Sequence, residues 1–384
     1  MVRFPGGTGV AACLRPVLAS VGPVLADIGD SYHLGETALG VLGALPLLVW
    51  AAFSPFAPGV GRRWGLERSI LLALLVLAGG MAIRSWAGAG GLWLGTAVAA
   101  AALAVGNVLL PAVVKRDFPR NLALVTGAYS AVIGISAALA SGLSVPFAQL
   151  LGGWRNGLAA WMLLPIVVAL LWVLRMRRSL AAVRPTAVSS TSRHGLRLLR
   201  SSMAWQVTVF FGLQSATFYT LITWLPAIED SYGYSAATSG LHLFLYQFFG
   251  VLCGLAVTAL MRARQDQRLA AVLVSLPVAI AMTGLMAFPG AAILWVVVAS
   301  CGAVAALTVS LGLIVLRTTS SEEASALSGM TQSIGYLLAA IGPIGAGLLA
   351  QAADDWQPVL TAMVVVSLVQ TVLSLWAGRT APSG

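Results

Sequence analysis

The chain has 384 residues, of which 59% are hydrophobic and 9% are charged. Water-soluble proteins carry about 25% charged residues, so this composition excludes a soluble globular protein and predicts one that crosses the lipid bilayer several times. The net charge of +10 arises from arginines placed between apolar stretches. That distribution argues against a nucleic-acid-binding protein, and we expect no nucleic-acid partner.

Charges and turn residues divide the apolar sequence into twelve predicted membrane-spanning helices, which makes the expected fold class an all-α integral membrane protein. The approximate spans are 4–26, 38–60, 69–87, 92–114, 122–145, 157–174, 203–227, 238–260, 269–287, 291–316, 325–349 and 356–377. Ala87–Gly91 separates the third span from the fourth, and Phe288–Gly290 separates the ninth from the tenth. At these two places glycine and proline, rather than charge, mark the division.

The positions of the basic residues predict the orientation. If the N-terminus is cytoplasmic, all but three of the 22 Lys and Arg residues fall in cytoplasmic loops. The exceptions are Arg84 and Arg155, which fall outside, and Arg15, which falls within a span. By the positive-inside rule we expect both termini to be cytoplasmic.

The longest predicted cytoplasmic loop, 175–202, is basic and separates an N-terminal six-helix half, 1–174, from a C-terminal six-helix half, 203–384. The halves also share a weak sequence repeat. The matching positions, at offsets of 200 and 202 residues, are Asp30-Ser31-Tyr32 with Asp230-Ser231-Tyr232, Gly40 with Gly240, Lys115 with Arg317, and Gly127 with Gly329. Together with the matching span order and loop charge, they predict two pseudo-symmetric halves related by an axis along the membrane normal.

Arg15 lies near the middle of the first predicted span, about 16 Å from each end. An arginine at this depth costs about 2.5–3.5 kcal/mol and usually faces a bundle interior or a water-filled cavity. Pro16 and Pro23 remove backbone hydrogen bonds nearby, which is tolerated where the backbone lines a cavity. We therefore predict that Arg15 binds substrate. The alternative is an arginine that reaches towards the membrane surface or pairs structurally, although no Asp or Glu lies at comparable depth.

Other polar and aromatic side chains well inside the spans are candidate substrate contacts. The repeat makes Ser215 the counterpart of Arg15, so we predict that Gln214, beside it, holds the substrate from the opposite half. The further candidates are Asn107, Tyr129, Tyr219, Tyr246, Gln247, Gln332 and Tyr336. The alternative for each of them is a hydrogen bond between helices.

The remaining reactive side chains predict no catalytic, cofactor or metal site. Cys13, Cys253 and Cys301 lie inside apolar stretches, so we expect neither disulfides nor thiolate metal ligands. The carboxylates lie in loops or at span ends, and His242, near the outer end of the eighth span, is interpreted as structural rather than as a proton relay. No His, Cys and Glu constellation has ligand spacing, so we expect no enzyme and no cofactor.

Three motifs resemble the cyanate/nitroimidazole transporter (CynX/NimT) family of the major facilitator superfamily, and the similarity covers essentially the whole chain. The motifs are Leu14-Arg15-Pro16 with Ser20-Val21-Gly22-Pro23, then Gly106-Asn107-Val108-Leu109-Leu110-Pro111 leading to Lys115-Arg116-Asp117-Phe118-Pro119, then Gln214 through Trp224-Leu225-Pro226. The resemblance implies a twelve-helix secondary transporter of a bacterial inner membrane that moves small solutes. Members are associated with cyanate uptake and nitroimidazole export. One departure is Arg62 before Arg63-Trp64-Gly65, where the superfamily usually carries an Asp that can form a gating salt bridge.

These residues predict a carrier that works by alternating access, with a small-molecule substrate. A guanidinium forms bidentate hydrogen bonds to planar oxyanions, so Arg15 at the midplane fits a small anion such as cyanate or a carboxylate. The alternative is an efflux pump for nitroimidazole-like or other hydrophobic drugs. The absence of a carboxylate at mid-membrane depth disfavours a simple carboxylate proton relay, although H+ stays a candidate coupling ion. We expect a monomer.

Overall fold

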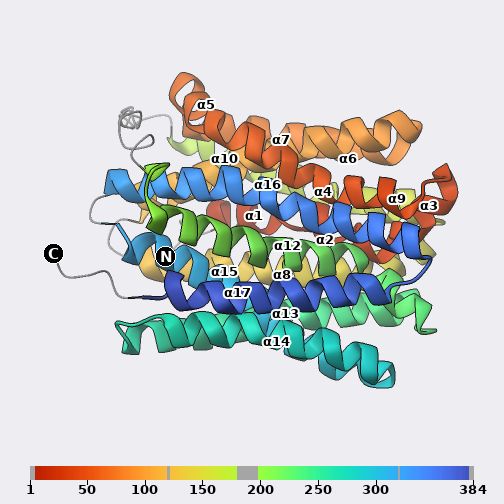
Figure 1. Ribbon diagram of the computed structural model, residues 1–384. Helices are drawn as coiled ribbons and strands as arrows, with labels where there is room; N and C mark the ends of the chain where they lie inside the picture. Colours follow the sequence, from red (N-terminus) through yellow and green to blue (C-terminus); the bar gives the residue numbers. More distant parts are fainter. Residues whose placement is uncertain (1–4, 119–121, 180–197, 319–320, 380–384) are drawn as a thin grey trace. The chain divides into compact units, whose positions relative to one another are not determined.

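The computed structural model describes residues 5–118, 122–179, 198–318 and 321–379, and every regular element in those ranges is a helix (Figure 1). The described residues form two compact units. Unit 1 takes those of Met1–Tyr32 and Leu45–Val188, and unit 2 takes those of His33–Ala44 and Ser189–Gly384. Most of the predicted loop 175–202 lies outside the described residues, and the predicted division into 1–174, 175–202 and 203–384 stays a prediction.

Unit 1 begins with a span that is divided into short pieces and continues with longer helices. Its elements are α1 (Pro5–Cys13), α2 (Pro16–Ala19), the 3-10 helix η1 (Gly22–Val24), α3 (Leu25–Tyr32), the second half of α4 (Glu36–Phe53), the 3-10 helix η2 (Ser54–Phe56), α5 (Ala57–Trp64), α6 (Leu66–Trp86), α7 (Gly88–Asp117), α8 (Leu122–Leu150), α9 (Trp154–Ala160) and α10 (Leu163–Ser179).

Unit 2 contains the first half of α4 and the helices of the C-terminal part of the chain. These are α12 (Ser202–Ser231), α13 (Ala236–Ala263), α14 (Arg268–Ala287), the 3-10 helix η3 (Pro289–Ala291), α15 (Ala292–Leu316), α16 (Ser321–Ala353) and α17 (Gln357–Ala377). The beginning of α4 packs on α16 within this unit, because the backbone N–H of Thr37 donates to Gln351 Oε1 at 3.0 Å.

Eleven stretches of the described residues are long and apolar enough to cross a membrane, which confirms the all-α membrane fold class. The predicted span absent from this set is 203–227, which corresponds to α12. At 30 residues, α12 is about 45 Å long and could cross a bilayer. Its hydropathy is reduced by buried polar side chains, namely Thr208, Gln214, Ser215, Thr217, Thr220 and Thr223. The seventh predicted span is therefore present as the helix α12, but it is unusually polar.

The two units repeat the same pattern of helix ends, as the sequence repeat predicts. Helix α3 ends at Tyr32 and is followed by His33 in a left-handed conformation with φ 53°, while α12 ends at Ser231 and is followed by Gly233 with φ 88°. The next helices begin at Glu36 and at Ala236, the same offset of 200 residues. The weak identities in the sequence thus mark equivalent turns.

Small residues allow the helices within each unit to pack closely, since lipid provides no hydrophobic force that drives helices together. In unit 1, α6 and α7 run side by side (Figure 1), and a Cβ atom placed on Gly80 would lie 2.7 Å from the backbone nitrogen of Ala99. In unit 2, a Cβ atom on Gly342 of α16 would lie 2.7 Å from the carbonyl oxygen of Ala216 on α12. Larger side chains at either glycine would push these helices apart.

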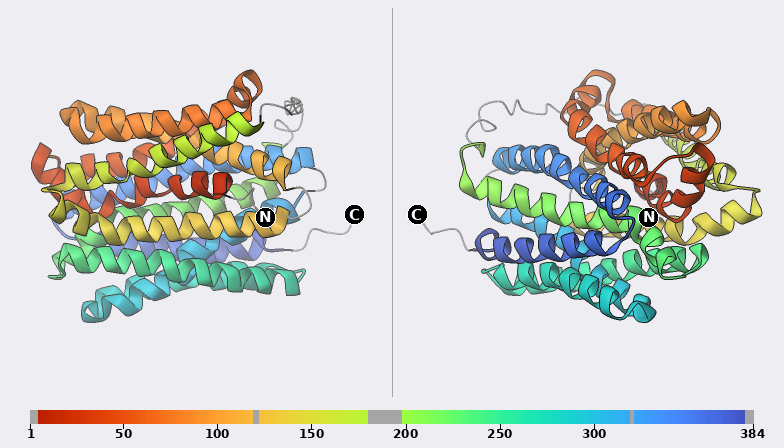
Figure 2. Two further views of the ribbon diagram at one scale, coloured as in Figure 1. Left: turned by 180° about the vertical axis from the view of Figure 1, so that it is seen from behind. Right: turned by 45° about the vertical axis from the view of Figure 1, so that its right-hand side comes forward.

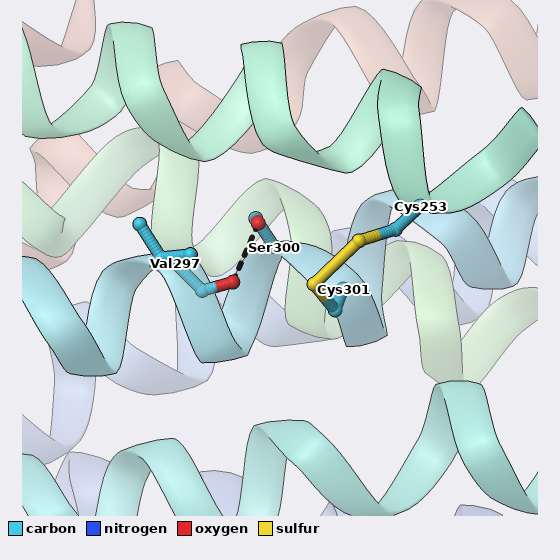
Figure 3. Close-up of a disulfide and its surroundings, with 4 residues drawn as sticks. All are labelled: Cys253, Val297, Ser300 and Cys301. Carbon is cyan, nitrogen blue, oxygen red and sulfur yellow. Dashed lines mark hydrogen bonds between the residues drawn. A yellow bond between two sulfur atoms is a disulfide. The ribbon is translucent and has the colours of Figure 1, made fainter. Parts of the chain in front are cut away.

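Cys253 on α13 and Cys301 on α15 form a disulfide (Figure 3), with their Cα atoms 5.2 Å apart. The expectation that the cysteines form no disulfide is therefore wrong for this pair. The sequence shows that each cysteine lies in an apolar span, but it does not show that the two residues, 48 positions apart, face one another across a helix contact. Cys13 is free and buried.

Candidate functional site

The first span is interrupted at Arg15. Helix α1 ends at Cys13 and α2 begins at Pro16, so Arg15 occupies the cap position before α2, with φ −118° and ψ −29°. Pro16 and Pro23 both lack an N–H group, which removes two hydrogen bonds that a continuous helix would contain. Figure 2 shows the consequence, since the red N-terminal segment is drawn as several pieces whereas the green α12 runs unbroken.

Side chains from two other helices of unit 1 bond the carbonyl groups that this break leaves free. The N–H of Val21 donates to the carbonyl of Leu18 at 3.2 Å, and not to the carbonyl of Val17, its partner in a regular α-helix. The carbonyl of Val17 accepts instead from Nη1 of Arg84 on α6, at 2.8 Å. Pro23 cannot donate to the carbonyl of Ala19, which accepts from Oγ of Ser141 on α8, at 3.0 Å. These donors satisfy backbone groups that would otherwise be unpaired in the interior.

The guanidinium of Arg15 lies over an aromatic ring held firmly in unit 1. Its Cζ atom is 5.7 Å from the ring centroid of Trp50 on α4, within the range of a cation–π interaction. Trp50 is fully buried, and its Nε1–H donates to the carbonyl of Ala100 on α7 at 3.0 Å. Arg15 itself is only half-buried. The ring therefore positions the cation without enclosing it.

Asn107 lies beside the contact that joins α7 to the broken span. A Cβ atom placed on its neighbour Gly106 would be 2.9 Å from Cδ2 of Leu14, so the backbone of α7 passes close to the residue before Arg15. Asn107 is half-buried, as is Tyr129 on α8. Two of the motifs that carry the family resemblance, Leu14-Arg15-Pro16 and Gly106-Asn107, thus meet within unit 1.

Arg84 lies near the end of the third predicted span, 69–87, and the structure shows what this side chain contacts. It belongs to the last turn of α6, is 1% exposed, and has its Nε and Nη2 atoms buried without a hydrogen-bond partner among the described residues. The hydroxyls of Ser20 and Ser85 are also buried without a hydrogen-bond partner among the described residues. The sequence does not show that Arg84 bonds the first span, because the carbonyl of Val17 that it bonds lies 67 residues earlier in the chain.

In unit 2, Gln214 and Ser215 are both buried, and the Nε2 of Gln214 donates to Ser215 Oγ at 2.6 Å. An aromatic cluster follows one turn later, where the ring of Phe218 meets Tyr219 edge-on at 5.0 Å and stacks on Tyr246 of α13 at 6.0 Å. The hydroxyl of Tyr246 is buried and has no hydrogen-bond partner among the described residues. The structure therefore brings Tyr219 and Tyr246 together, as neighbours of one phenylalanine.

The other predicted residues of unit 2 lie on α13 and α16. Gln247 is buried next to Tyr246. Gln332 donates through Nε2 to Ser328 Oγ at 2.9 Å, and Tyr336 meets Phe211 of α12 edge-on at 5.3 Å. Of these candidates, Tyr336 contacts α12, whereas Gln332 bonds a residue of its own helix, α16. Joint binding of one substrate by these residues and Arg15 stays a prediction.

A buried acid–histidine pair is the feature that the sequence interpretation missed. Oε1 of Glu229 on α12 lies 2.7 Å from Nδ1 of His242 on α13, and the two side chains are 0% and 5% exposed. Glu229 stands near a span end, as expected, but it does not face solvent. The sequence did contain a signal for this contact, since Glu229 and His242 are only 13 residues apart and lie on either side of the turn between α12 and α13.

A second charged cluster joins three helices of unit 1 at the end of α7. Arg116 and Arg175 each bond both Glu67 and Asp117, and Arg175 also lies over the ring of Trp172, at 4.6 Å. Burial disfavours the charged form of Asp117, but hydrogen bonds from the two arginines outweigh burial and hold the pKa of its carboxyl below its usual value. Across the described residues, no group of three or more His, Cys, Asp and Glu side chains is arranged to hold a metal ion.

Comparisons with known proteins agree with this architecture. Residues 9–343 match the family model described as Major Facilitator Superfamily. The chain is 40% identical over 381 residues to the 2-nitroimidazole transporter of Escherichia coli (strain K12), covering 99% of this chain and 96% of that protein. It is 26% identical over 338 residues to the cyanate transport protein CynX of the same organism, covering 88% and 86%. A solved bacterial homologue of the human lysosomal transporter Spinster shares the fold, with a TM-score of 0.80 at 15% identity and coverage of 99% and 98%.

Proposed function

Because the chain belongs to the Major Facilitator Superfamily, and within it resembles the nitroimidazole and cyanate transporters, we propose that it carries a small planar solute across the membrane by alternating access, with Arg15 as the main polar contact. The family membership makes it a membrane transporter, and its relatives are named as transporters rather than as enzymes. The identity of the solute and the role of Arg15 are the proposal.

The observation that carries the role of Arg15 is the interrupted helix. Backbone irregularity and a cation at membrane depth are both costly, and both are tolerated where they line a cavity. Here the break is supported by Arg84 and Ser141, while Arg15 is left half-buried beside Trp50. A purely structural arginine would be expected in the position that Arg84 occupies, bonded to the backbone and enclosed.

We propose a small anion, or a molecule with the terminal oxygens of a nitro or carboxylate group, as the substrate. The planar fork of a guanidinium fits such groups through two parallel hydrogen bonds. Trp50 adds a flat apolar surface next to the cation. Cyanate, which one relative is named for transporting, is small and negatively charged.

A second candidate is export of nitroimidazole-like or other hydrophobic drugs. The relative with 40% identity is named for 2-nitroimidazole, a flat molecule that carries both a ring and a nitro group. The rings of Phe218, Tyr219 and Tyr246 in unit 2 would suit stacking with such a ring. The two candidates therefore differ in which unit contributes more to affinity.

The proposed setting is a bacterial inner membrane with both termini in the cytoplasm, and the proposed working form is a monomer. This orientation places Ser235, which is exposed and caps the start of α13, on the outer side. A single cysteine at Ser235 should then react with an impermeant maleimide added to intact cells.

Counterflow of labelled solute in proteoliposomes tests the function. Wild-type protein should exchange cyanate or 2-nitroimidazole, and Arg15→Lys should reduce exchange severely, because an ammonium is a point charge rather than a planar fork. Arg155→Lys is the matched control, since Arg155 also lies over aromatic rings, at 5.3 and 4.8 Å, but at the exposed start of α9. Normal exchange by a correctly inserted Arg15→Lys protein would remove Arg15 from the site.

A further inference from the structure

Unit 1 encloses a guanidinium that is only partly hydrogen-bonded. Arg84 is 1% exposed, and its Nη1 donates to the carbonyl of Val17 at 2.8 Å. Its Nε and Nη2, which form one edge of the guanidinium fork, are buried and meet no acceptor in the described part of the chain. An enclosed charge is costly unless an opposite charge and hydrogen bonds accompany it. Arg84 therefore needs a partner that the protein has not supplied at this edge.

The surrounding helices carry no carboxylate at this end of the unit. From Arg68 to Ser179, which covers the rest of α6 and all of α7 to α10, the sequence contains one acid, Asp117. It lies in the charged cluster with Glu67 at the start of α6, about 26 Å from Arg84 along the helix axis. Two acids of α3 are exposed, namely Asp27 and Asp30. Among the described residues, the charge of Arg84 is therefore not balanced by an acid.

A second unbonded donor lies on the turn of the first span that Arg84 reaches. In a regular helix the N–H of Val21 would stand at the carbonyl of Val17. Since Arg84 bonds that carbonyl instead, its guanidinium lies at the level of residues 20 and 21. Ser20 is 0% exposed, and its hydroxyl is buried without a hydrogen-bond partner in the described ranges.

A third unbonded donor comes from the residue that directly follows α9. The indole of Trp161 packs against the small cluster that Ala19 of the first span forms with Ala137 and Ala140 of α8. Its Nε1–H is buried and has no acceptor among the residues that the structure describes. Because Ala19 precedes Ser20, three helices direct unbonded donors toward one turn of the broken span.

The chemistry of these groups defines what can bind them. The N–H groups of Arg and Trp donate hydrogen bonds and cannot accept them, and a Ser hydroxyl can donate as well. A ligand that satisfies all three must therefore accept hydrogen bonds, and one that also balances Arg84 must carry negative charge. Water meets only the first requirement. The edge formed by Nε and Nη2 suits two oxygens of a planar oxyanion or one halide ion.

We propose that unit 1 binds a small monovalent anion, of the class of chloride or nitrate, between Arg84, Ser20 and Trp161. The anion is a structural ligand, because the guanidinium that it neutralises also bonds the interrupted first span. This site is distinct from the one proposed at Arg15, which is half-buried and lies over Trp50 of α4. The inference therefore goes beyond the proposed function and does not depend on which solute is carried.

Thermal unfolding of the purified protein in detergent tests the inference. The protein is first exchanged into gluconate, an anion too large for an enclosed site, and chloride or nitrate is then titrated at constant ionic strength. The unfolding temperature of wild type should rise and saturate, because the ligand binds the folded state. Arg84→Gln should abolish the rise. Ser20→Ala and Trp161→Phe should each move its midpoint about tenfold or more to higher concentration, since each loses a hydrogen bond to a charged group.

Two control variants separate this site from its surroundings. Ser85→Ala removes an equally buried hydroxyl from the residue after Arg84, about 100° away around α6, and should keep the wild-type midpoint. Arg15→Gln removes the other cation of the first span and should also keep it. Loss of the rise in Arg15→Gln, together with its retention in Arg84→Gln, would assign the anion to the proposed substrate site and overturn the inference.

Crystals grown in bromide test the position of the anion in the unsubstituted protein, so the test stands even where Arg84→Gln does not fold. An anomalous peak within hydrogen-bond distance of Nε and Nη2 of Arg84 is the expected result. Water alone at that position would overturn the site, as would a wild-type unfolding temperature that neither anion changes. Failure of cyanate and 2-nitroimidazole to exchange in counterflow would instead overturn the proposed function and leave this site intact.

Discussion

The first span of unit 1 and helix α12 of unit 2 occupy equivalent places in the repeat, yet one is broken and the other is continuous. Both reach a turn with the sequence Asp-Ser-Tyr and both contain proline. Pro226 lies inside α12 without interrupting it, so one proline does not account for the difference. Apart from Pro5 at its start, the first span has two prolines seven residues apart, Pro16 and Pro23, together with Gly22. Its neighbours provide donors for the carbonyls that are freed.

The comparison extends to the polar groups that each unit buries. Unit 1 holds cations, with Arg84 enclosed and Arg15 half-buried. Unit 2 holds the acid–histidine pair and the amide of Gln214. The two units thus have similar helix patterns but bury different polar groups. In unit 1, the backbone is interrupted where the cation Arg15 lies.

Closing the break should have the largest effect on transport. Proline costs about 3 kcal/mol relative to alanine inside a helix, so the double variant Pro16→Ala/Pro23→Ala should allow the first span to become continuous, as α12 is. Arg15 would then leave its position, and a penalty of about 1.4 kcal/mol or more in reaching the working state would lower transport at least about tenfold. Counterflow rates measure this, with Pro226→Ala as the control in the equivalent helix. Full activity of the double variant would show that the break is not needed.

Removing the amide of Gln214 should weaken binding of an anionic substrate by roughly 10- to 100-fold, the cost of losing a hydrogen bond to a charged group. The notable alternative is that Gln214 only bonds Ser215, in which case affinity would not change. A double-mutant cycle with Arg15→Ala distinguishes the two, because residues that share a ligand give non-additive losses. Strictly additive losses would argue against a ligand held by both residues.

Arg84 offers the smallest and most local test, since its effect should be on stability. Arg84→Gln removes the bond to the carbonyl of Val17 and should lower the free energy of unfolding by about 1.5–3 kcal/mol. Thermal unfolding in detergent measures the loss, with the exposed Arg155→Gln as the control. A wild-type unfolding temperature for Arg84→Gln would mean that the broken span is held by other contacts.

The spans, the repeat and the irregular backbone at Arg15 could be predicted from the sequence because they depend on local properties. Hydropathy, proline and charge are read within a window of one helix. The pairing of Arg84 with Val17, of Glu229 with His242 and of Cys253 with Cys301 could not be predicted, because each depends on which faces of two helices meet. The polar character of α12 was visible in its sequence, but its burial was not.

The central claim, that Arg15 binds substrate at the break in the first span, is tested most directly by ligand affinity. Binding of cyanate and of 2-nitroimidazole to purified wild type, Arg15→Lys and Arg155→Lys should be measured at one pH and one salt concentration. The account predicts that Arg15→Lys binds at least one of these ligands about tenfold or more weakly, a loss of about 1.4 kcal/mol, while Arg155→Lys matches wild type. Equal affinities for all three proteins would contradict it.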